Sequence, residues 1–338
     1  MEKQKFIDEC NRRAASGAPF IFVIDYELNN FHTYDIGEAA SAGIFYDIRG
    51  EGNESKIPVT SKIYSAEDQM SPPDPGSAYT FEITPVKYAQ YQNAFDLVRK
   101  NILHGNSFLL NLTFPTKLET NLTLEQIFRH SRAPYKLLFK DRFVVFSPES
   151  FVRISDDRIF TYPMKGTIDA ALEDAERKLM ENEKEQWEHN TIVDLLRNDL
   201  SMVAKDVAVL KYRYIDRIRT HRKELLQVSS EIAGRLEPGW KGRLGEILVT
   251  MLPAGSICGA PKPKTLEIIA QAEGEKRGYF TGIFGIFQNG RVDSAVMIRY
   301  IERAGEGLRF RSGGGITWHS DPESEYNELI DKVYVPIV

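Results

Sequence analysis

The chain has 338 residues, of which 42% are hydrophobic and 27% charged, and this ordinary globular composition excludes a disordered, collagen-like or low-complexity protein. A total of 43 Lys and Arg stand against 48 Asp and Glu, so the net charge of −5 gives no global positive field that would attract nucleic acid. The two cysteines, Cys10 and Cys258, are too few for a disulfide framework and lie in no zinc-binding spacing, which favours a reducing compartment.

We expect no targeting signal in the N-terminal residues of this sequence. Residues 1–13 are charged throughout, and the apolar run at residues 20–24 is far shorter than the ~20 residues that cross a bilayer. We therefore expect a soluble, cytoplasmic protein that binds neither membranes nor nucleic acid. Residues 20–24 and 43–48 are predicted strands of a short β-rich segment, residues 1–76, which packs on a main domain, residues 77–338.

The remaining elements follow from hydrophobic periodicity and from turn residues. A proline-rich loop is expected at residues 65–77, and the spacing of Tyr88, Tyr91, Phe95, Val98 and Ile102 predicts a helix over residues 84–106. Strands are expected at residues 108–114, 137–146, 151–160, 207–217, 279–288, 293–302 and 307–311. Further helices are expected within residues 169–200, 244–251 and 263–272, and after Asp321.

Strands outnumber the helices that could connect them in parallel, so the sequence predicts a mixed α/β (α+β) fold with largely antiparallel sheets. Asn289-Gly290 marks a hairpin turn, and residues 147–150 form a tight turn that presents Glu149. No glycine-rich dinucleotide motif and no P-loop motif occurs in the chain, which disfavours nucleotide cofactors.

Acidic residues occur at helical spacing near two predicted helices. Glu325, Glu328 and Lys332 share one face of the closing helix, where the carboxylates could bind a hard cation or could simply form a solvated charged face. Glu188 and His189 lie beside an apolar stripe that looks buried, formed by Trp187, Ile192, Leu195 and Leu196. Glu188 could complete a magnesium site, whereas His189 is better suited to hydrogen bonding than to metal ligation.

Other candidate residues carry weaker signals on their own. Gly313, Gly314 and Gly315 permit positive φ and could offer successive backbone N–H groups to a carboxylate or phosphate. Arg299 interrupts an apolar predicted strand, which indicates an anionic partner, either an internal carboxylate or a ligand. Lys165 lies in a tight turn, where a surface lysine is the simplest interpretation. The basic run at residues 211–223 is more simply a strand with one solvated face than a nucleic-acid site.

Six segments that contain most of these candidate residues resemble, in order along the chain, the motifs of the chorismate-utilising enzymes. The segments are Ser147-Pro-Glu149, Pro163-Met-Lys-Gly-Thr167, Glu188-His189 with Val193–Asp199, Pro253–Pro261, Ile298-Arg299, and Gly313–Ile316 with Ser320–Glu328. The match runs from about Thr84 to the C-terminus. The resemblance implies antiparallel sheets packed as a sandwich, with helices outside.

Lys165 distinguishes branches within this family. Anthranilate synthase large subunits typically carry alanine at this position, whereas component I of aminodeoxychorismate synthase carries lysine. The chain thus resembles the latter branch, which aminates chorismate to 4-amino-4-deoxychorismate for p-aminobenzoate and folate synthesis. An anthranilate or isochorismate-type synthase is the alternative within the family, and a non-catalytic binder of related metabolites is the alternative outside it. The short N-terminal segment implies no feedback inhibition by tryptophan.

Two departures from the family pattern occur. Gly314 replaces a usual alanine, and Phe108-Leu-Leu-Asn111 replaces Tyr-Gln-Val-Asn near the expected ammonia route. The second departure leaves coupling to a glutaminase open.

The resemblance also implies roles for individual residues. Glu188 and Glu328, with Glu325 nearby, would hold Mg²⁺ against the ring carboxylate of chorismate. Lys165 would be the nucleophile and Glu149 the proton donor, and a separate glutamine amidotransferase subunit would supply ammonia. The substrate-binding residues would be Arg299, Lys332, Thr167, His189 and the glycines Gly313, Gly314 and Gly315.

Overall fold

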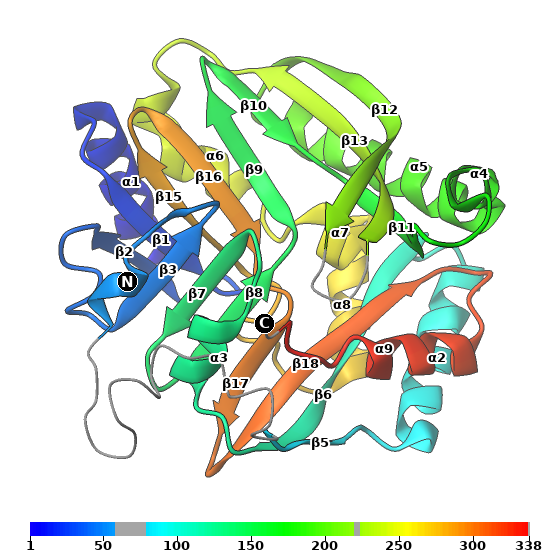
Figure 1. The fold of residues 1–338 in the computed structure, drawn as a ribbon. Coiled ribbons are helices and arrows are strands. Elements are labelled where there is room, and N and C mark those ends of the chain that lie inside the picture. Colours follow the sequence, from blue (N-terminus) through cyan, green and yellow to red (C-terminus); the bar gives the residue numbers. More distant parts are fainter. Residues whose placement is uncertain (58–78, 220–223, 337–338) are drawn as a thin grey trace.

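The structure is a computed structural model that describes residues 1–57, 79–219 and 224–336 (Figure 1). The helices are α1 (Lys3–Ser16), α2 (Tyr88–Leu103), α3 (Leu124–His130), α4 (Ala175–Glu181), α5 (Glu183–Ser201), α6 (Leu244–Thr250), α7 (Gly255–Cys258), α8 (Lys262–Glu273) and α9 (Pro322–Asp331), with 3-10 turns at Glu54–Lys56 and Trp240–Arg243. None of the helices described is long and apolar enough to cross a membrane.

The strands are β1 (Phe20–Ile24), β2 (Phe31–Asp35), β3 (Ile44–Ile48), β4 (Glu51–Gly52), β5 (Phe81–Thr84), β6 (Leu109–Thr120), β7 (Tyr135–Phe139), β8 (Phe143–Ser147), β9 (Ser150–Ser155), β10 (Arg158–Thr161), β11 (Met164–Asp169), β12 (Lys205–Arg219), β13 (Glu224–Arg235), β14 (Gly259–Ala260), β15 (Ile283–Gln288), β16 (Arg291–Val296), β17 (Tyr300–Ala304) and β18 (Gly307–Ile316). The pairings between them are antiparallel.

These strands form two sheets that pack face to face. One sheet has the order β11-β13-β10-β9-β16-β15-β1-β2, and β12 also pairs with β13. The other has the order β14-β6-β18-β17-β8-β7-β3-β4, and β5 also pairs with β6. The helices lie outside the sheets (Figure 1), so the predicted antiparallel sandwich with outer helices is confirmed.

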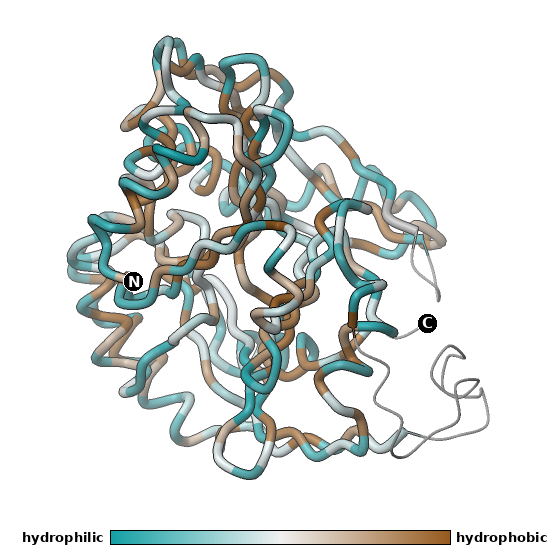
Figure 2. Tube along the Cα trace, turned by 90° about the vertical axis from the view of Figure 1, so that its left-hand side faces the viewer, coloured by the Kyte–Doolittle hydropathy of each residue, from teal (hydrophilic) through white to brown (hydrophobic). Residues whose placement is uncertain are grey.

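Strand β1 shows why the sheets pack in this way. Its five residues are all buried, but successive side chains point to opposite faces. Ile21 and Val23 belong to the core between the sheets, whereas Phe20, Phe22 and Ile24 belong to the core beneath α1, α5 and α6. Both faces of the strand therefore require apolar residues, and hydrophobic residues gather along the interior of the molecule (Figure 2).

The N-terminal residues contribute to both sheets. β1 and β2 extend one sheet, and β3 and β4 extend the other. The predicted loop at residues 65–77 and the predicted domain boundary at residue 76 lie outside the described residues, so the division into two domains stays a prediction. Helix α1 was not predicted, because its buried stripe of Phe6, Ile7, Cys10 and Ala14 is interrupted by charged residues.

Three of the predicted strands are each two strands. The predicted strand over residues 137–146 is the hairpin β7–β8, and the one over residues 151–160 is the hairpin β9–β10. Aspartates with positive φ lie at these turns, Asp141 in the first and Asp156 and Asp157 in the second. Asp tolerates this conformation, and the apolar pattern continues on both sides of each turn, so hydrophobicity alone did not reveal it.

The third split strand changes sheets. The predicted strand over residues 293–302 is β16 in one sheet and β17 in the other. The chain also changes sheets between β8 and β9, at Pro148-Glu149. The two crossings lie side by side, because the N–H of Phe146 donates to the carbonyl of Arg299 at 3.0 Å and the N–H of Val296 donates to the carbonyl of Glu149 at 3.1 Å.

Several predicted helices are confirmed, two of them to within one residue at each end and the first with bounds three to four residues shorter at each end. The helices over residues 84–106, 244–251 and 263–272 are α2, α6 and α8, and the helix after Asp321 is α9, where the Asp321 side chain accepts from the N–H of Ser324. Asn289 and Gly290 both have positive φ in the β15–β16 turn. The basic run begins in β12, where Lys211 and Arg217 form ion pairs with Glu231 and Glu176, and residues 220–223 lie outside the described residues.

A buried ion pair joins helix α8 to strand β6. The Arg277 Nη2 lies 2.5 Å from Glu273 Oε1, and both side chains are at most 3% exposed. Arg277 also donates to the carbonyl of Asn111 at 2.7 Å, and Glu273 accepts from the N–H and hydroxyl of Thr113 at 2.9 Å. The two charged side chains therefore neutralise each other and also form hydrogen bonds with backbone groups of β6.

Replacing one member of this pair will destabilise the protein. Arg277→Met leaves the Glu273 carboxylate buried without its counter-charge, and we expect the free energy of unfolding to fall by about 3–5 kcal/mol in urea denaturation. Arg217→Met, which removes a surface ion pair with Glu176 whose side chains are more than half exposed, is the matched control, with an expected loss of at most about 1 kcal/mol. Equal losses in both variants would contradict the argument.

Candidate functional site

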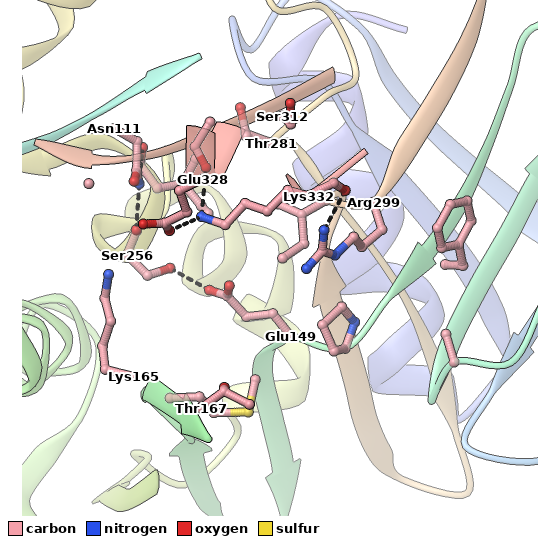
Figure 3. A pocket seen from close by; sticks show the side chains of 18 of the residues that line it. Asn111, Glu149, Lys165, Thr167, Ser256, Thr281, Arg299, Ser312, Glu328 and Lys332 are labelled. Carbon is pink, nitrogen blue, oxygen red and sulfur yellow. Dashed lines mark hydrogen bonds and ion pairs between the residues drawn. The ribbon is translucent and has the colours of Figure 1, made fainter. Parts of the chain in front are cut away.

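A cavity of about 1210 Å³ lies where the two sheets meet α5, α7 and α9 (Figure 3). It collects most of the predicted site residues: Glu149, Lys165, Thr167, Glu188, Arg299, Gly313, Gly315, Glu325, Glu328 and Lys332 all line it. His189 and Gly314 are not on its wall. The structure therefore brings together residues that are up to 183 positions apart, between Glu149 and Lys332.

Lys165 projects into the cavity from β11. A register shift separates Lys165 from Thr167, and the intervening Gly166 has a φ of +74°. The Nζ atom lies 3.3 Å from Oε2 of Glu188 on α5. Burial lowers the pKa of Lys165, but Glu188, with Glu185 and Glu328, outweighs burial, and the net pKa is raised. In the ligand-free cavity Lys165 is therefore an ammonium group.

Glu149 lies at the β8–β9 crossing and faces the same cavity. The hydroxyl of Ser256 on α7 donates to its Oε1 at 2.8 Å. Burial raises the pKa of Glu149, while Ser256, Lys165 and Lys332 oppose the rise without cancelling it. The carboxyl group therefore keeps its proton to a higher pH than an exposed glutamate does, as a proton donor requires.

The closing helix supplies two carboxylates and one lysine. Lys332 Nζ lies 2.6 Å from Glu328 Oε1 and donates to the carbonyl of Gly313 at 2.9 Å. A Cβ on Gly314 would lie 3.2 Å from Glu325 Oε2 and 3.8 Å from Glu328 Oε1. The helix therefore packs its acidic face against the backbone of β18, and glycine leaves room for the carboxylates.

The three glycines form extended strand and not a loop. Gly313, Gly314 and Gly315 pair with Thr113, Leu112 and Asn111 of β6, and none of them has positive φ. The carbonyl of Gly313 points to Lys332, on the edge away from β6, and the N–H groups of Gly313 and Gly315 point to the same edge. The expected run of three exposed N–H groups is thus wrong, since Gly314 faces β6.

Arg299 was predicted to lie in a strand. It lies instead in the β16–β17 crossing, with a φ of +51°. Its Nη1 donates to the carbonyl of Lys332 at 2.5 Å, and the guanidinium lies 4.6 Å from the centre of the Tyr334 ring. Burial lowers its pKa, with Tyr334 and Glu328 opposing this. Arg299 is thus a half-buried cation held at the cavity wall mainly by neutral groups.

His189 lies behind the cavity wall. It is 1% exposed, and its Nε2 is 2.7 Å from the hydroxyl of Ser230. Burial, with Arg213 and Lys165, lowers its pKa to about 4, so it is neutral. His189 does not line the cavity, and its predicted contact with substrate stays a prediction. Trp187, expected to be buried, is 66% exposed.

Several polar residues that line the cavity were not predicted as site residues: Asn111, Glu185, Gln227, Ser256 and Thr281. Glu185 lies three residues before Glu188 on α5, and this helical spacing places the two carboxylates on the same face. Gln227 donates from its Nε2 to the hydroxyl of Thr167 at 3.3 Å, at the exposed rim. Of these residues, Asn111 and Ser256 lie in segments that were compared with the family pattern, Phe108–Asn111 and Pro253–Pro261, but neither was singled out as a site residue.

The donor set suits a hard cation. Glu188, Glu325 and Glu328 offer carboxylate oxygens to one cavity, as Mg²⁺ prefers. Among the described residues, however, no three acidic, histidine or cysteine side chains come close enough to hold a metal ion. Lys165 and Lys332 lie beside two of these carboxylates. A cation would therefore replace lysine ammonium groups as the counter-charge.

The Lys165–Glu188 pair gives a direct prediction. Glu188→Gln removes the main group that raises the pKa of Lys165, so burial will lower that pKa and increase the neutral amine. Each unit of fall increases the neutral fraction about tenfold. We expect faster labelling of Lys165 by an amine-reactive reagent near pH 8 in EDTA, followed by mass spectrometry. Glu185→Gln should give a smaller increase, and an unchanged labelling rate in Glu188→Gln would contradict the pairing.

Comparison with known proteins agrees with this geometry. The chain is 51% identical over 334 residues to a Haemophilus influenzae protein described as an uncharacterized PabA-like protein, covering 99% of this chain and 97% of that one. A PabA-like protein of Pasteurella multocida is 50% identical over the full length of both chains. Anthranilate synthase component 1 of Haloarcula marismortui is 32% identical over 91% of this chain, which spans 60% of that protein.

Solved structures show the same fold. Anthranilate synthase component I from Streptococcus pneumoniae superposes with a TM-score of 0.64 at 28% identity, over 75% of this chain and 58% of that chain. The menaquinone-specific isochorismate synthase MenF of Escherichia coli superposes with a TM-score of 0.72 at 17% identity, over 97% and 80% of the two chains. The family described as chorismate binding enzyme matches residues 9–337, and the chain therefore belongs to this family of chorismate-utilising enzymes.

Proposed function

We propose that this chorismate-utilising enzyme is component I of aminodeoxychorismate synthase, which converts chorismate and ammonia to 4-amino-4-deoxychorismate for p-aminobenzoate and folate synthesis. The observation that carries the proposal is Lys165, whose amine enters the same cavity as the carboxyl of Glu149 (Figure 3). A lysine at this position supplies a nucleophile that alanine lacks. The two PabA-like relatives, about half identical over almost the whole chain, support the same pathway.

Substrate binding would use the charges that the cavity provides. Chorismate carries two carboxylates, and Arg299, Lys332 and the N–H groups at the edge of β18 suit the pyruvyl carboxylate. Glu188 and Glu328, with Glu325 nearby, would hold Mg²⁺. When bound, Mg²⁺ would supply the positive charge that fixes the ring carboxylate in an otherwise acidic wall.

The chemistry would proceed through Lys165. Lys165 first releases a proton to solvent, and its neutral amine attacks C2 of the ring. The two conjugated ring double bonds shift from C1=C2 and C5=C6 to C6=C1 and C4=C5, and the C4–O bond breaks while Glu149 gives its proton to the hydroxyl, which leaves as water. Ammonia then attacks C4, both double bonds shift back to their original positions and the C2–N bond breaks, which releases Lys165. Glu149 recovers one proton from the incoming ammonia. The sum is chorismate plus ammonia giving 4-amino-4-deoxychorismate plus water.

Ammonia would come from a separate glutamine amidotransferase. Amide hydrolysis requires an activated nucleophile, and both Cys10 and Cys258 are buried. Burial raises the pKa of both thiols, that of Cys258 to about 11, so neither is a thiolate at neutral pH.

The product of the reaction tests the proposal. We expect the purified chain with chorismate, Mg²⁺ and ammonium to form the 4-amino isomer, and to load a covalent adduct on Lys165 when ammonium is withheld, both seen by mass spectrometry. Lys165→Ala should abolish the adduct and slow C4 amination by orders of magnitude. Lys165→Arg should not aminate C4, because a guanidinium stays protonated.

Two outcomes would contradict this assignment. One is unchanged C4 amination in Lys165→Ala. The other is a wild-type product that is the 2-amino isomer or isochorismate, which would return the chain to the alternative reactions of its family.

The metal site gives a separate prediction. We expect activity to require Mg²⁺, and Glu188→Gln or Glu328→Gln to lower it by orders of magnitude, because an amide oxygen is a weaker ligand for a hard cation. Glu325→Gln should lower the activity less than either of these two variants does. The exposed Glu323→Gln on the same helix is the control and should behave as wild type. Titration calorimetry with Mg²⁺ should show weaker binding in the first two variants only, and full activity in EDTA would refute the site.

A further inference from the structure

Helix α7 is a single turn, Gly255–Cys258, held from three sides. The N–H of Gly255 donates to Asp199 Oδ2 on α5 at 2.9 Å. On β6, the amide of Asn111 donates to the carbonyl of Ser256 at 2.8 Å and to that of Ile257 at 2.9 Å. Arg277 in turn donates to the carbonyl of Asn111 at 2.7 Å. A turn this short cannot hold its position alone, so its place is set by these neighbours.

The contact with Asp199 leaves no room for adjustment. A Cβ on Gly255 would lie 2.7 Å from Asp199 Oδ2, so the close approach requires glycine. The other oxygen of Asp199 lies 2.7 Å from Lys262 Nζ, which also donates to the carbonyl of Met251 at 2.9 Å. One buried carboxylate thus ties both ends of the loop at residues 251–262 to the helix that carries Glu188.

The side chain that this turn presents is Ser256. Its hydroxyl donates to Oε1 of Glu149 at 2.8 Å, across the cavity wall (Figure 3). The backbone of Glu149 is fixed separately, by its N–H to the hydroxyl of Ser147 at 3.1 Å and by its carbonyl to the N–H of Val296 at 3.1 Å. With the backbone fixed, the carboxyl group can still move by rotation about the side-chain bonds of Glu149. The hydrogen bond from Ser256 restricts this rotation.

We propose that Ser256 is a positioning residue whose hydroxyl holds Oε1 of Glu149, so that the proton carried by Oε2 is directed into the cavity. The inference rests on the proposed role of Glu149 as proton donor. A serine hydroxyl that donates to Oε1 leaves Oε2 as the oxygen that carries the proton. Without this hydrogen bond the carboxyl group can turn, and the proton is aimed at the substrate for only part of the time.

The hydrogen bond also affects the charge state of Glu149. The groups that act on this carboxyl are Ser256 on α7, Lys165 on β11 and Lys332 after α9, all of which favour the ionised form against burial. Arg299 lines the same cavity from the β16–β17 crossing. Removing the Ser256 hydroxyl will therefore raise the pKa of Glu149 further, and the protonated acid will persist to higher pH.

The test compares variants at position 256 by the pH dependence of chorismate consumption. Ser256→Ala should lower kcat by about 10- to 100-fold, part of the 10²- to 10⁴-fold that a positioned acid supplies, and should move the falling alkaline limb to higher pH. Ser256→Thr, which keeps the hydroxyl, should have the wild-type kcat, and the alkaline limb of its pH profile should lie at the wild-type pH. Ser256→Val, of the same shape without the hydroxyl, should behave like Ser256→Ala.

A matched control comes from the same region. Ser107→Ala removes another buried hydroxyl, which donates to the carbonyl of Ala260 at 3.1 Å and lies 2.9 Å from the hydroxyl of Thr265. It should leave the alkaline limb at its wild-type position. Wild-type rate in Ser256→Ala, or equal rate losses in Ser256→Thr and Ser256→Val with an unmoved limb, would overturn the proposal in favour of a merely structural serine.

An infrared titration separates this inference from the proposed function. The protonated carboxyl band of Glu149, assigned by its loss in Glu149→Gln, should disappear at higher pH in Ser256→Ala than in wild type, without any turnover. An unmoved band would overturn the role of Ser256. Persistence of the alkaline limb in Glu149→Gln, with a band that does shift, would instead remove Glu149 as the proton donor and leave the Ser256 contact intact.

Discussion

The cavity depends on two places where the chain passes from one sheet to the other. Glu149 lies in the first crossing and Arg299 in the second, and two backbone hydrogen bonds hold the crossings together. Each crossing joins strands that have their own neighbours in both sheets, so neither can shift without disturbing two ladders. An acid and a cation are thereby held at the same wall by main-chain geometry, independently of their own side-chain contacts.

The charges of the cavity compensate one another before any ligand arrives. Lys165 lies beside Glu188 and Lys332 beside Glu328, while Gly314 lets the carboxylates of α9 approach the strand. Without the lysines, several carboxylates would share one partly buried space, and mutual repulsion would oppose folding. Binding of a cation and an anionic ligand would then exchange one set of counter-charges for another, which costs less than creating new buried charge.

The sequence predicted the chemistry of the site better than its geometry. Glu149, Lys165 and Glu188 were found from motifs, and α9 from its N-cap and proline, because these signals are local. The local conformations predicted for Arg299 and for the glycines were wrong, since a change of sheet and the choice of strand edge depend on long-range pairing. Ser256 and Glu185 were missed as site residues, because only the folded chain brings α7 and the first turns of α5 to Glu149 and Lys165.

Strand β11 combines a chemical role with a small structural one. It ends its sheet, pairs only with β13 among the described strands and carries a register shift next to Lys165. A substitution at position 165 therefore disturbs one ladder, where a substitution at either crossing disturbs two. Under the proposed function, the residue that decides which ring atom is attacked would lie on a strand held by one ladder, whereas Glu149 and Arg299 lie at crossings held by two. A change of reaction at position 165 would then disturb less of the scaffold than a change of the acid or of the arginine.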